Sequence, residues 1–223
     1  MDFDLLTRLN DLRSTRSAAI VATDMGEGTQ QLFVKGSVPD DEPLKDDLAA
    51  RFLSGKSGMV GAVFLAVYVP PPRLVIIGAV HISQHMIAPA QAAGFDVSVI
   101  DPRTAFANEE RFPNVALHAS WPEEVLKDEP LDAYTALAAL THDPKIDDGA
   151  LQAALEAQCF YVGALGSRKS HAKRLERLRA EGLSDEALAQ IDAPIGLDIG
   201  AASPAEIAVS VLGSVIAKLR GKA

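Results

Sequence analysis

The spacing of hydrophobic positions changes at three consecutive prolines, Pro70–Pro72. Before them, apolar residues recur at helical spacing over 3–12 and 44–53, while apolar runs at 17–23, 30–34 and 61–68 indicate strands, the first two joined as a β-hairpin. Consecutive prolines favour a stiff, extended connector. We therefore expect a small N-terminal α+β domain over residues 1–69 and a second domain over residues 70–223.

The second part of the chain alternates short apolar runs with helical patterns. Strands are expected at 73–78, 96–100, 136–140 and 159–163, and helices at 83–93, 147–157, 167–181 and 204–219. Alternation of this kind indicates parallel βαβ units joined by right-handed crossovers. The predicted fold class is α/β, a Rossmann-like doubly wound parallel sheet beside the small N-terminal α+β domain.

Composition and charge exclude several classes of protein. With 48% apolar and 23% charged residues, the 223-residue chain can bury a substantial core. Its net charge of −9 opposes binding to a nucleic-acid backbone. The apolar runs are shorter than the roughly 20 residues of a membrane helix, and the acidic start is unlike a signal peptide, so we expect a cytoplasmic protein without a membrane span.

The chain contains one cysteine, Cys159. A single thiol forms no internal disulfide and builds no multi-thiolate zinc site. Its apolar neighbours favour a small buried hydrophobe on a strand, and the alternative is a reactive or sulfur-carrying thiol.

The turn after the first strand of the second domain has part of a dinucleotide-binding pattern. It begins with Gly78, but Val80 stands where the pattern G-x-G-x-x-G has its second glycine, next to the pyrophosphate. Asp101 follows Gly78 near the spacing of about 20 that is typical of a ribose-binding carboxylate, and Arg103 could instead attract a phosphate. The pattern predicts a ligand-binding edge and argues against ordinary NAD-dependent hydride transfer.

Two histidines are expected at this same carboxyl edge of the sheet. His81 starts the first helix of the domain, and its role is either acid, base or ligand, or simply an exposed turn residue. His142 and Asp143 end the third strand. Their spacing is weak evidence for a metal, so we assign no metal site and no catalytic residue. Asp147 and Asp148 are interpreted as charges that favour the dipole of the next helix.

The segment after the fourth strand has the features of an anion site. A helix N-terminus offers free N–H groups and a positive dipole end, and glycines allow close approach of a ligand. The predicted phosphate-binding residues are Gly163, Gly166, Ser167, Arg168 and Lys169. The alternative is a plain helix cap with solvated cations. Asp198 lies in a glycine-containing loop and is either a site carboxylate or a turn former.

Several of these stretches closely resemble the XdhC/CoxI family of accessory factors for molybdenum hydroxylases such as xanthine dehydrogenase and carbon monoxide dehydrogenase. The motifs are Leu140–Pro144, Tyr161–Lys169 and Pro194–Gly200, together with Asp101–Arg103 and Arg111–Pro113. The resemblance runs from about Pro72 to the C-terminus, and the N-terminal part looks like a shortened version of the family's first domain.

The resemblance implies a cofactor carrier. It implies binding of the molybdenum cofactor, a pterin in mono- or dinucleotide form, its protection while a cysteine desulfurase installs the terminal sulfur, and its transfer to the apo-hydroxylase. Apart from the resemblance, the small size of the N-terminal unit favours a homodimer in which a partner covers its free face. The residues expected to line the sheet edge beside the phosphate site are Gly78, His81, Asp101, Arg103, His142 and Asp198.

The chain departs from the family pattern at two positions. Family members usually carry Gly-Gly-Cys in the first domain, whereas Gly36-Ser37-Val38 is followed here by Pro39 and no cysteine. The turn that is commonly Gly-Ala-Gly-His in the family is Gly-Ala-Val-His here. Two alternatives stay open: an NAD(P)-binding oxidoreductase, and a degenerate regulatory or scaffold subunit that holds no cofactor.

Overall fold

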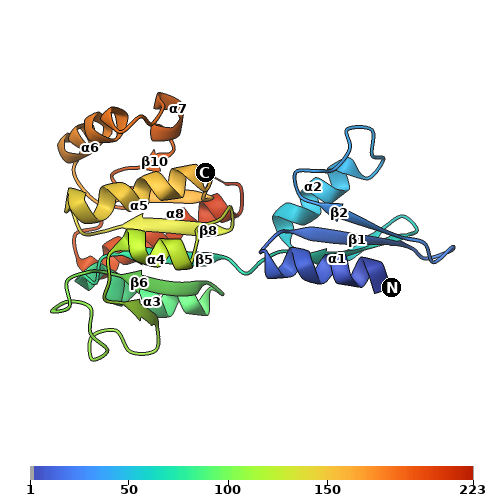
Figure 1. The fold of residues 1–223 in the computed structure, drawn as a ribbon, viewed down its shortest axis with the longest axis horizontal. Helices are drawn as coiled ribbons and strands as arrows, with labels where there is room; N and C mark the ends of the chain where they lie inside the picture. The colour runs from blue at the N-terminus through green and yellow to red at the C-terminus, as the bar shows by residue number, and fades with distance from the viewer. Residues whose placement is uncertain (1–2, 223) are drawn as a thin grey trace. The chain divides into compact units, whose positions relative to one another are not determined.

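The computed structural model describes residues 3–222, and the chain divides into two compact units between Pro70 and Pro71 (Figure 1). The first unit contains, in order, α1 (Phe3–Ser14), β1 (Ala19–Asp24), β2 (Gln30–Val34), α2 (Lys45–Ser54), β3 (Gly58–Val60) and β4 (Val63–Tyr68). Its four strands form an antiparallel sheet in the order β2-β1-β4-β3.

The side chains of β1 alternate between the two faces of this small sheet, and each face packs against a helix. Ala19 and Val21 point to one face, where they pack with Leu9 of α1, because successive strand residues face opposite sides. The helix α2 packs against β1 and β4 and ends at Gly55, whose left-handed conformation closes it. The expected hairpin and both expected helices are confirmed, while β3 was not predicted.

The second unit is a parallel sheet with helices on both sides. Its elements are β5 (Arg73–Ile77), α3 (His81–Ala92), β6 (Asp96–Ile100), β7 (Ala116–His118), α4 (Pro122–Asp128), β8 (Thr135–Ala139), α5 (Pro144–Glu156), β9 (Tyr161–Ala164), α6 (Arg168–Ala180), α7 (Asp185–Leu188), β10 (Ile191–Asp192) and α8 (Pro204–Leu219). The strands pair in the order β10-β9-β8-β5-β6-β7, which is the order 6-5-4-1-2-3 of a Rossmann fold. The predicted fold class is confirmed.

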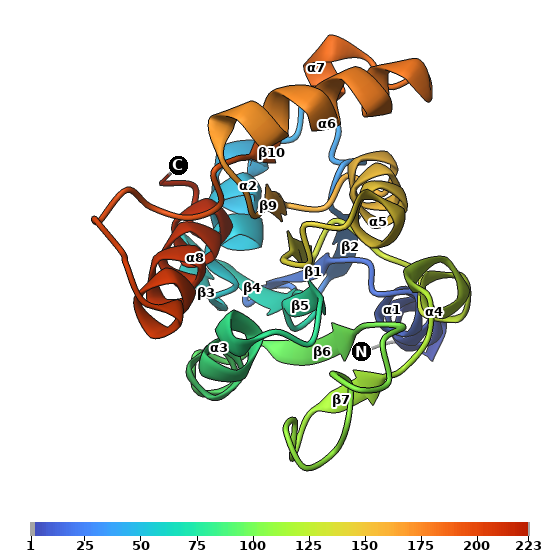
Figure 2. The same cartoon turned by 90° about the vertical axis from the view of Figure 1, so that its left-hand side faces the viewer.

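Two apolar layers hold this sheet. Leu74 and Ile76 of β5 pack in the layer formed with α3 and α8, and Val75 and Ile77 pack in the layer formed with α5. Figure 2 shows α3 and α8 along one side of the strands and α4 and α5 along the other. Because β5 is buried on both faces from Leu74 onward, its sequence is continuously apolar over Leu74–Ile77. Each of its aliphatic side chains stabilises the fold by about 1.5–3 kcal/mol through burial.

Some predicted boundaries were wrong. The helix expected from Asp147 begins at Pro144, because Asp143 caps it and proline is favoured at the first helical position. The helix expected from Ser83 begins at His81. Four short elements, β7, α4, α7 and β10, were not predicted. The prediction of the last helix, Pro204–Leu219, is confirmed at both ends.

Candidate functional site

The carboxyl ends of the parallel strands bring together most of the predicted residues of the second unit. Gly78 follows β5, Asp101 follows β6, the segment Thr141–Asp143 follows β8, and the segment Leu165–Ser167 follows β9. We call this side of the sheet the carboxyl edge. The strands β5 and β8 are neighbours there, and the chain order reverses between them, which makes this point the topological switch at which such folds bind ligands.

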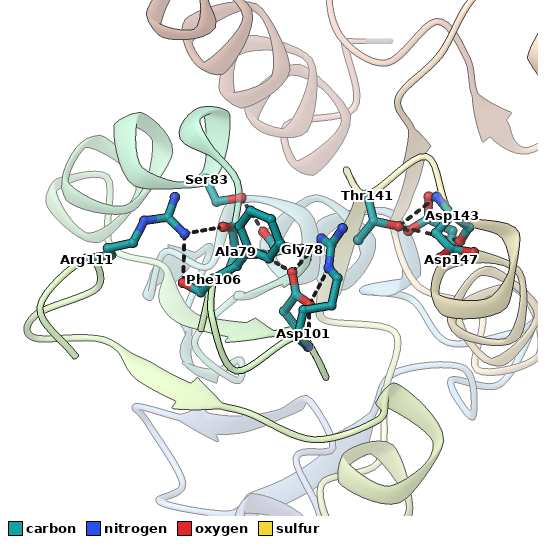
Figure 3. Close-up of polar contacts among 10 residues, drawn as sticks. Gly78, Ala79, Ser83, Asp101, Phe106, Arg111, Thr141, Asp143 and Asp147 are labelled. Atoms are coloured by element: carbon teal, nitrogen blue, oxygen red, sulfur yellow. Dashed lines mark hydrogen bonds and ion pairs between the residues drawn. The ribbon is translucent and has the colours of Figure 1, made fainter. Parts of the chain in front are cut away.

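Gly78 brings the first turn into contact with the end of β8. Its φ is +116°, and a Cβ atom at this position would lie 2.8 Å from Thr141 Cγ2. A side chain is therefore excluded both by backbone conformation and by packing. Ser83 Oγ donates a hydrogen bond to the Gly78 carbonyl and ties the turn to α3 (Figure 3).

Asp101 is fully buried and is hydrogen-bonded to its own chain. Oδ2 accepts from Ala79 N at 2.8 Å and from Arg103 Nη2 at 2.7 Å, and Oδ1 accepts from Arg103 N and Nε at 2.9 Å each. Burial by itself raises the pKa of Asp101, but the hydrogen bonds from Arg103 and Ala79 outweigh burial and hold that pKa below its ordinary value. A carboxylate has about four acceptor positions, so in this geometry Asp101 positions protein groups, with none left for a ribose hydroxyl.

Arg103 and Arg111 fix the loop after β6 across the first turn. The Arg103 guanidinium lies 4.7 Å from the centre of the half-exposed Phe106 ring while it pairs with Asp101. Arg111 Nη1 donates to the carbonyls of Ala79 at 3.1 Å and Phe106 at 2.8 Å (Figure 3). The roles of Phe106 and Arg111 were not predicted, since they depend on how this loop folds back.

The start of α3 presents an exposed histidine. Val80 is the N-cap of the helix in an extended conformation and makes no capping hydrogen bond through its side chain. His81 is the first helical residue and is exposed. It lies at the carboxyl edge, as the sequence pattern indicated.

The Thr141–Asp143 loop is held by a chain of hydrogen bonds (Figure 3). Thr141 Oγ1 donates to Asp147 Oδ1 at 2.7 Å and accepts from Asp143 N at 3.0 Å, and Asp143 Oδ1 accepts from Lys145 N to cap α5. His142 between them is exposed and has a left-handed φ of +63°, which is unusual for a residue with a side chain.

Asp147 has a second role beyond the one the sequence suggested. It does lie in the first turn of α5, but only 1% of it is exposed. Burial raises the pKa of Asp147 to about 6, although the hydrogen bond from Thr141 and the charge of Arg174 act in the opposite direction. The carboxylate therefore belongs to the interior behind the carboxyl edge.

The start of α6 has the geometry of an anion site. Ser167 is the N-cap, and its Oγ accepts from Ser170 N at 3.2 Å. Helix geometry leaves the N–H groups of Arg168 and Lys169 without intrahelical partners, and both side chains are exposed. Gly166 has a φ of +139°, and a Cβ there would lie 2.8 Å from Ser170 Oγ and 3.8 Å from His142 Nδ1. The Leu165–Ser167 loop and the Thr141–Asp143 loop are therefore adjacent.

Two predicted residues make none of the contacts described above. Gly163 is buried within β9, where a Cβ would lie 2.7 Å from Ile195, so packing explains the glycine. Asp198 is exposed in the loop between β10 and α8. The neighbouring Leu197 ties this loop to α8, because its N–H donates to the Ser210 carbonyl.

A cavity of about 490 Å³ opens at the opposite edge of the sheet, where β9 and β10 begin. Its lining includes Cys159, Tyr161, Asp192, Ser214 and Lys218. Cys159 is buried, which raises the pKa of its thiol to about 12, and Tyr161 Oη donates to Asp192 at 2.6 Å. The expectation that Cys159 is a small buried side chain is confirmed, since a thiol in this state is unreactive.

Residues 3–222 lack two features that bear on function. No helix in this range is long and apolar enough to cross a membrane. The same residues contain no cluster of three or more His, Cys, Asp and Glu side chains arranged to hold a metal ion, so His81 and His142 are not joined in such a group.

Comparison with known proteins gives a consistent set of relatives. The family model described as the XdhC Rossmann domain matches residues 74–215. The chain is 36% identical over 158 residues to the uncharacterized protein YqeB of Escherichia coli K12, covering 70% of this chain and 29% of that protein. It is 34% identical over 146 residues to the molybdenum cofactor insertion chaperone PaoD of the same organism, covering 66% and 40%.

Two further comparisons extend this set. The chain is 32% identical over 148 residues to a probable xanthine dehydrogenase subunit of Bacillus subtilis 168, covering 66% of this chain and 43% of that protein. It therefore spans less than half the length of these three relatives. A crystal structure described as a xanthine dehydrogenase from Bacillus halodurans has the same fold, with a TM-score of 0.66, 22% identity and coverage of 99% of this chain and 65% of that one.

Proposed function

The chain belongs to the XdhC family, and from this premise we propose that it is an accessory factor that binds the molybdenum cofactor and assists its sulfuration and insertion into a molybdenum hydroxylase. The names of two relatives, a molybdenum cofactor insertion chaperone and a probable xanthine dehydrogenase subunit, support this role. Those proteins are longer than this chain, so the activity, partners and cofactor are proposed here and not carried over.

The observation that supports cofactor binding most directly is the start of α6. The cofactor is a flat pterin that ends in a phosphate or a nucleotide diphosphate. Free N–H groups, the positive end of a 13-residue helix and the exposed cations Arg168 and Lys169 are suited to that charge. Gly166 has no Cβ, which lets the turn before α6 pack closely against Ser170 of its first helical turn. The residues present therefore fit the phosphate end of the cofactor.

Each part of the carboxyl edge has a separate task in this proposal. Arg168 and Lys169 pair with the phosphate, and the N–H groups of the first turn of α6 orient it. His142 and His81 are exposed at the same edge, where they would contact the ring system of the bound cofactor. The bound cofactor supplies molybdenum redox chemistry to the hydroxylase, and this chain contributes binding, orientation and release.

Sulfur delivery is proposed to come directly from a cysteine desulfurase. Cys159 is the chain's single cysteine, and it is buried with a raised thiol pKa at the edge opposite the phosphate site. A sulfur carrier needs an exposed thiolate. We therefore place the desulfurase and the apo-hydroxylase as partners, to be tested by co-purification of each with the full chain.

The geometry disfavours an NAD(P)-dependent oxidoreductase. Val80 places a branched side chain next to the position of a pyrophosphate, and the Asp101 carboxylate is fully engaged by Ala79 and Arg103. Neither residue is then available for the contacts that hold a dinucleotide in this fold.

Anaerobic titration of the full chain with molybdopterin tests the proposal. We expect the double variant Arg168→Ala/Lys169→Ala to lose about tenfold in affinity, a loss of about 1.4 kcal/mol. Lys173→Ala is the matched control, since Lys173 is an exposed cation farther along the same helix. Equal affinity of the double variant and the control would show that the phosphate assignment is wrong, and tighter binding of NADH than of molybdopterin would overturn the proposed function.

A further inference from the structure

Two oppositely charged side chains are buried directly behind the carboxyl edge. Asp147 of α5 is 1% exposed and Arg174 of α6 is 4% exposed. Each makes a hydrogen bond to one of the two edge loops: Asp147 Oδ1 accepts from Thr141 Oγ1 at 2.7 Å, and Arg174 Nη2 donates to the carbonyl of Leu165 at 2.9 Å. Leu165 directly precedes Gly166, so the hydrogen bond from Arg174 lies next to the proposed phosphate site.

The remaining polar atoms of this pair are unsatisfied but complementary. Among the described residues, Asp147 Oδ2 is a buried acceptor without a hydrogen-bond partner, and Arg174 Nε and Nη1 are buried donors without one. A buried charge is costly unless an opposite charge compensates it. Burial lowers the pKa of Arg174 and raises that of Asp147, and the charge of each side chain opposes the effect of burial on the other, so each is a buried counter-charge of the other.

Other charged groups face this pair from three elements. On α5 and α6, Asp148 pairs with Arg177 at 2.6 Å and is partly exposed. His171, one turn before Arg174, has a pKa lowered by burial and by the Arg174 charge. The Arg103 guanidinium lies in the loop after β6. Its hydrogen bond to Asp101 raises the pKa of Arg103, and the charges of Asp143 and Asp147 raise it further. The Asp147–Arg174 pair differs from Asp148–Arg177 because only its members bond the edge loops.

We propose that Asp147 and Arg174 form a positioning pair that fixes the Thr141–Asp143 loop against the Leu165–Ser167 loop and thereby sets the affinity for the phosphate end of the cofactor. This inference rests on the proposed function. Neither side chain touches the ligand, since both lie behind the loops that do.

The contacts of Thr141 explain how a buried carboxylate acts on the edge. The Thr141 hydroxyl that donates to Asp147 also accepts from Asp143 N, and the Thr141 methyl group packs against Gly78. His142 is held in its left-handed conformation between these contacts. Without the acceptor on Asp147, the hydroxyl is free to turn and the loop relaxes. A binding site that is less well preorganised binds its ligand more weakly.

The matched comparison uses the neighbouring ion pair on the same two helices. We expect Asp147→Ala and Arg174→Gln each to lower molybdopterin affinity about tenfold, and the double variant to lose less than the product of the two, because the pair acts as a unit. Asp147→Asn should recover part of the loss, since its amide oxygen still accepts from Thr141. Asp148→Asn and Arg177→Gln should leave the affinity unchanged. If the variants of Asp148 and Arg177 lost as much molybdopterin affinity as those of Asp147 and Arg174, the inference would be overturned.

The pH profile separates positioning by the charge from a merely structural role. Asp147 is ionised above about pH 6 and neutral below it. The ratio of wild-type to Asp147→Asn affinity should therefore fall toward one between pH 7.5 and pH 5, while the titration of the ligand phosphate cancels in that ratio. A ratio that is independent of pH contradicts the role of the charge.

A ligand-free measurement distinguishes failure of this inference from failure of the proposed function. The Asp143 amide donates to Thr141, so its hydrogen exchange should accelerate in Asp147→Ala and stay slow in Asp148→Asn. Unchanged exchange overturns the positioning pair, whatever the cofactor does. Absence of molybdopterin binding to the wild type, with accelerated exchange in Asp147→Ala, overturns the proposed function but supports the positioning of the Thr141–Asp143 loop by Asp147. If Arg174→Gln fails to fold, the two Asp147 variants carry the test.

Discussion

At the scale of single residues, glycine conformation shapes the proposed phosphate site. Gly166 has a φ of +139°, and a Cβ there would lie 2.8 Å from Ser170 Oγ. Gly149 offers a contrast, because it lies within α5 with open space around its missing side chain. The same substitution should therefore have opposite effects at the two positions.

We predict that Gly166→Ala lowers the free energy of unfolding by about 1–3 kcal/mol, because the backbone there disfavours a side chain. Gly149→Ala should raise it by about 0.5–1 kcal/mol, because alanine restricts the unfolded chain and suits a helix. Urea denaturation of both variants measures these changes. A Gly166→Ala variant as stable as the wild type would contradict the described turn.

Asp147 gives the fold a dependence on pH with a defined sign. Its pKa is about 6 in the folded chain, against an ordinary value of 3.8, so folding favours the protonated form. Its contribution to stability is fully present below about pH 4 and is lost as the pH rises through 6. The loss amounts to about 3 kcal/mol at most, at 1.36 kcal/mol per pKa unit.

The measurement is the free energy of unfolding of the wild type and of Asp147→Asn at pH 4.5, 6 and 7.5. We predict that the wild type loses stability relative to the variant as the pH rises. Asp148→Asn serves as the control, since Asp148 is partly exposed and paired with Arg177. A constant difference between wild type and Asp147→Asn across this range would contradict the raised pKa.

The sequence predicted where the edge residues lie better than what they bond. Asp101 follows its strand at the expected place, but its orientation depends on the Arg103 side chain folding back onto it, which spacing does not reveal. Asp147 was interpreted only as a charge that favours the dipole of the next helix. The sequence did contain a signal that Asp147 is buried. At helical spacing it lies on the same face as Ala150, Leu151 and Ala154, all of which are buried.

At the scale of elements, capping residues mark where two long helices of the second unit begin. Ser203 and Pro204 mark the start of α8, and the structure contains the full capping box between Ser203 and Glu206. Asp143 and Pro144 give the same signal for α5, whose start was placed too late. The strands β7 and β10 have three and two residues, too few for an alternation pattern to appear in the sequence.

We predict that Ser203→Ala lowers the free energy of unfolding by about 1 kcal/mol, because the variant leaves an N–H group at the start of α8 without its cap. Ser184→Ala is the control, since Ser184 caps the four-residue, mostly exposed helix α7. Its effect should be smaller. Thermal denaturation compares the two, and an equal loss would show that the capping box does not anchor α8.

At the scale of the whole molecule, strand order places the candidate site. Alternating strands and helices implied a parallel sheet, and right-handed crossovers restrict how its strands are ordered. The observed order puts β5 between β6 and β8. At this switch point the chain continues from β5 into α3 on one face of the sheet and from β8 into α5 on the other face. Gly78 and Thr141 meet there, and the Leu165–Ser167 loop lies next to them. Contacts between side chains of separate loops complete the site, and these contacts follow from the fold and not from local sequence.

The central claim is that the full chain carries a pterin bound by its phosphate end at the start of α6. Its most direct test is the mass of the small molecule released when the chain, co-expressed with an intact pterin pathway and purified without oxygen, is denatured. We predict a pterin bearing a phosphate or nucleotide, retained by Lys173→Ala and depleted in Arg168→Ala/Lys169→Ala. Release of a nicotinamide dinucleotide, or of no small molecule at all, would contradict this claim.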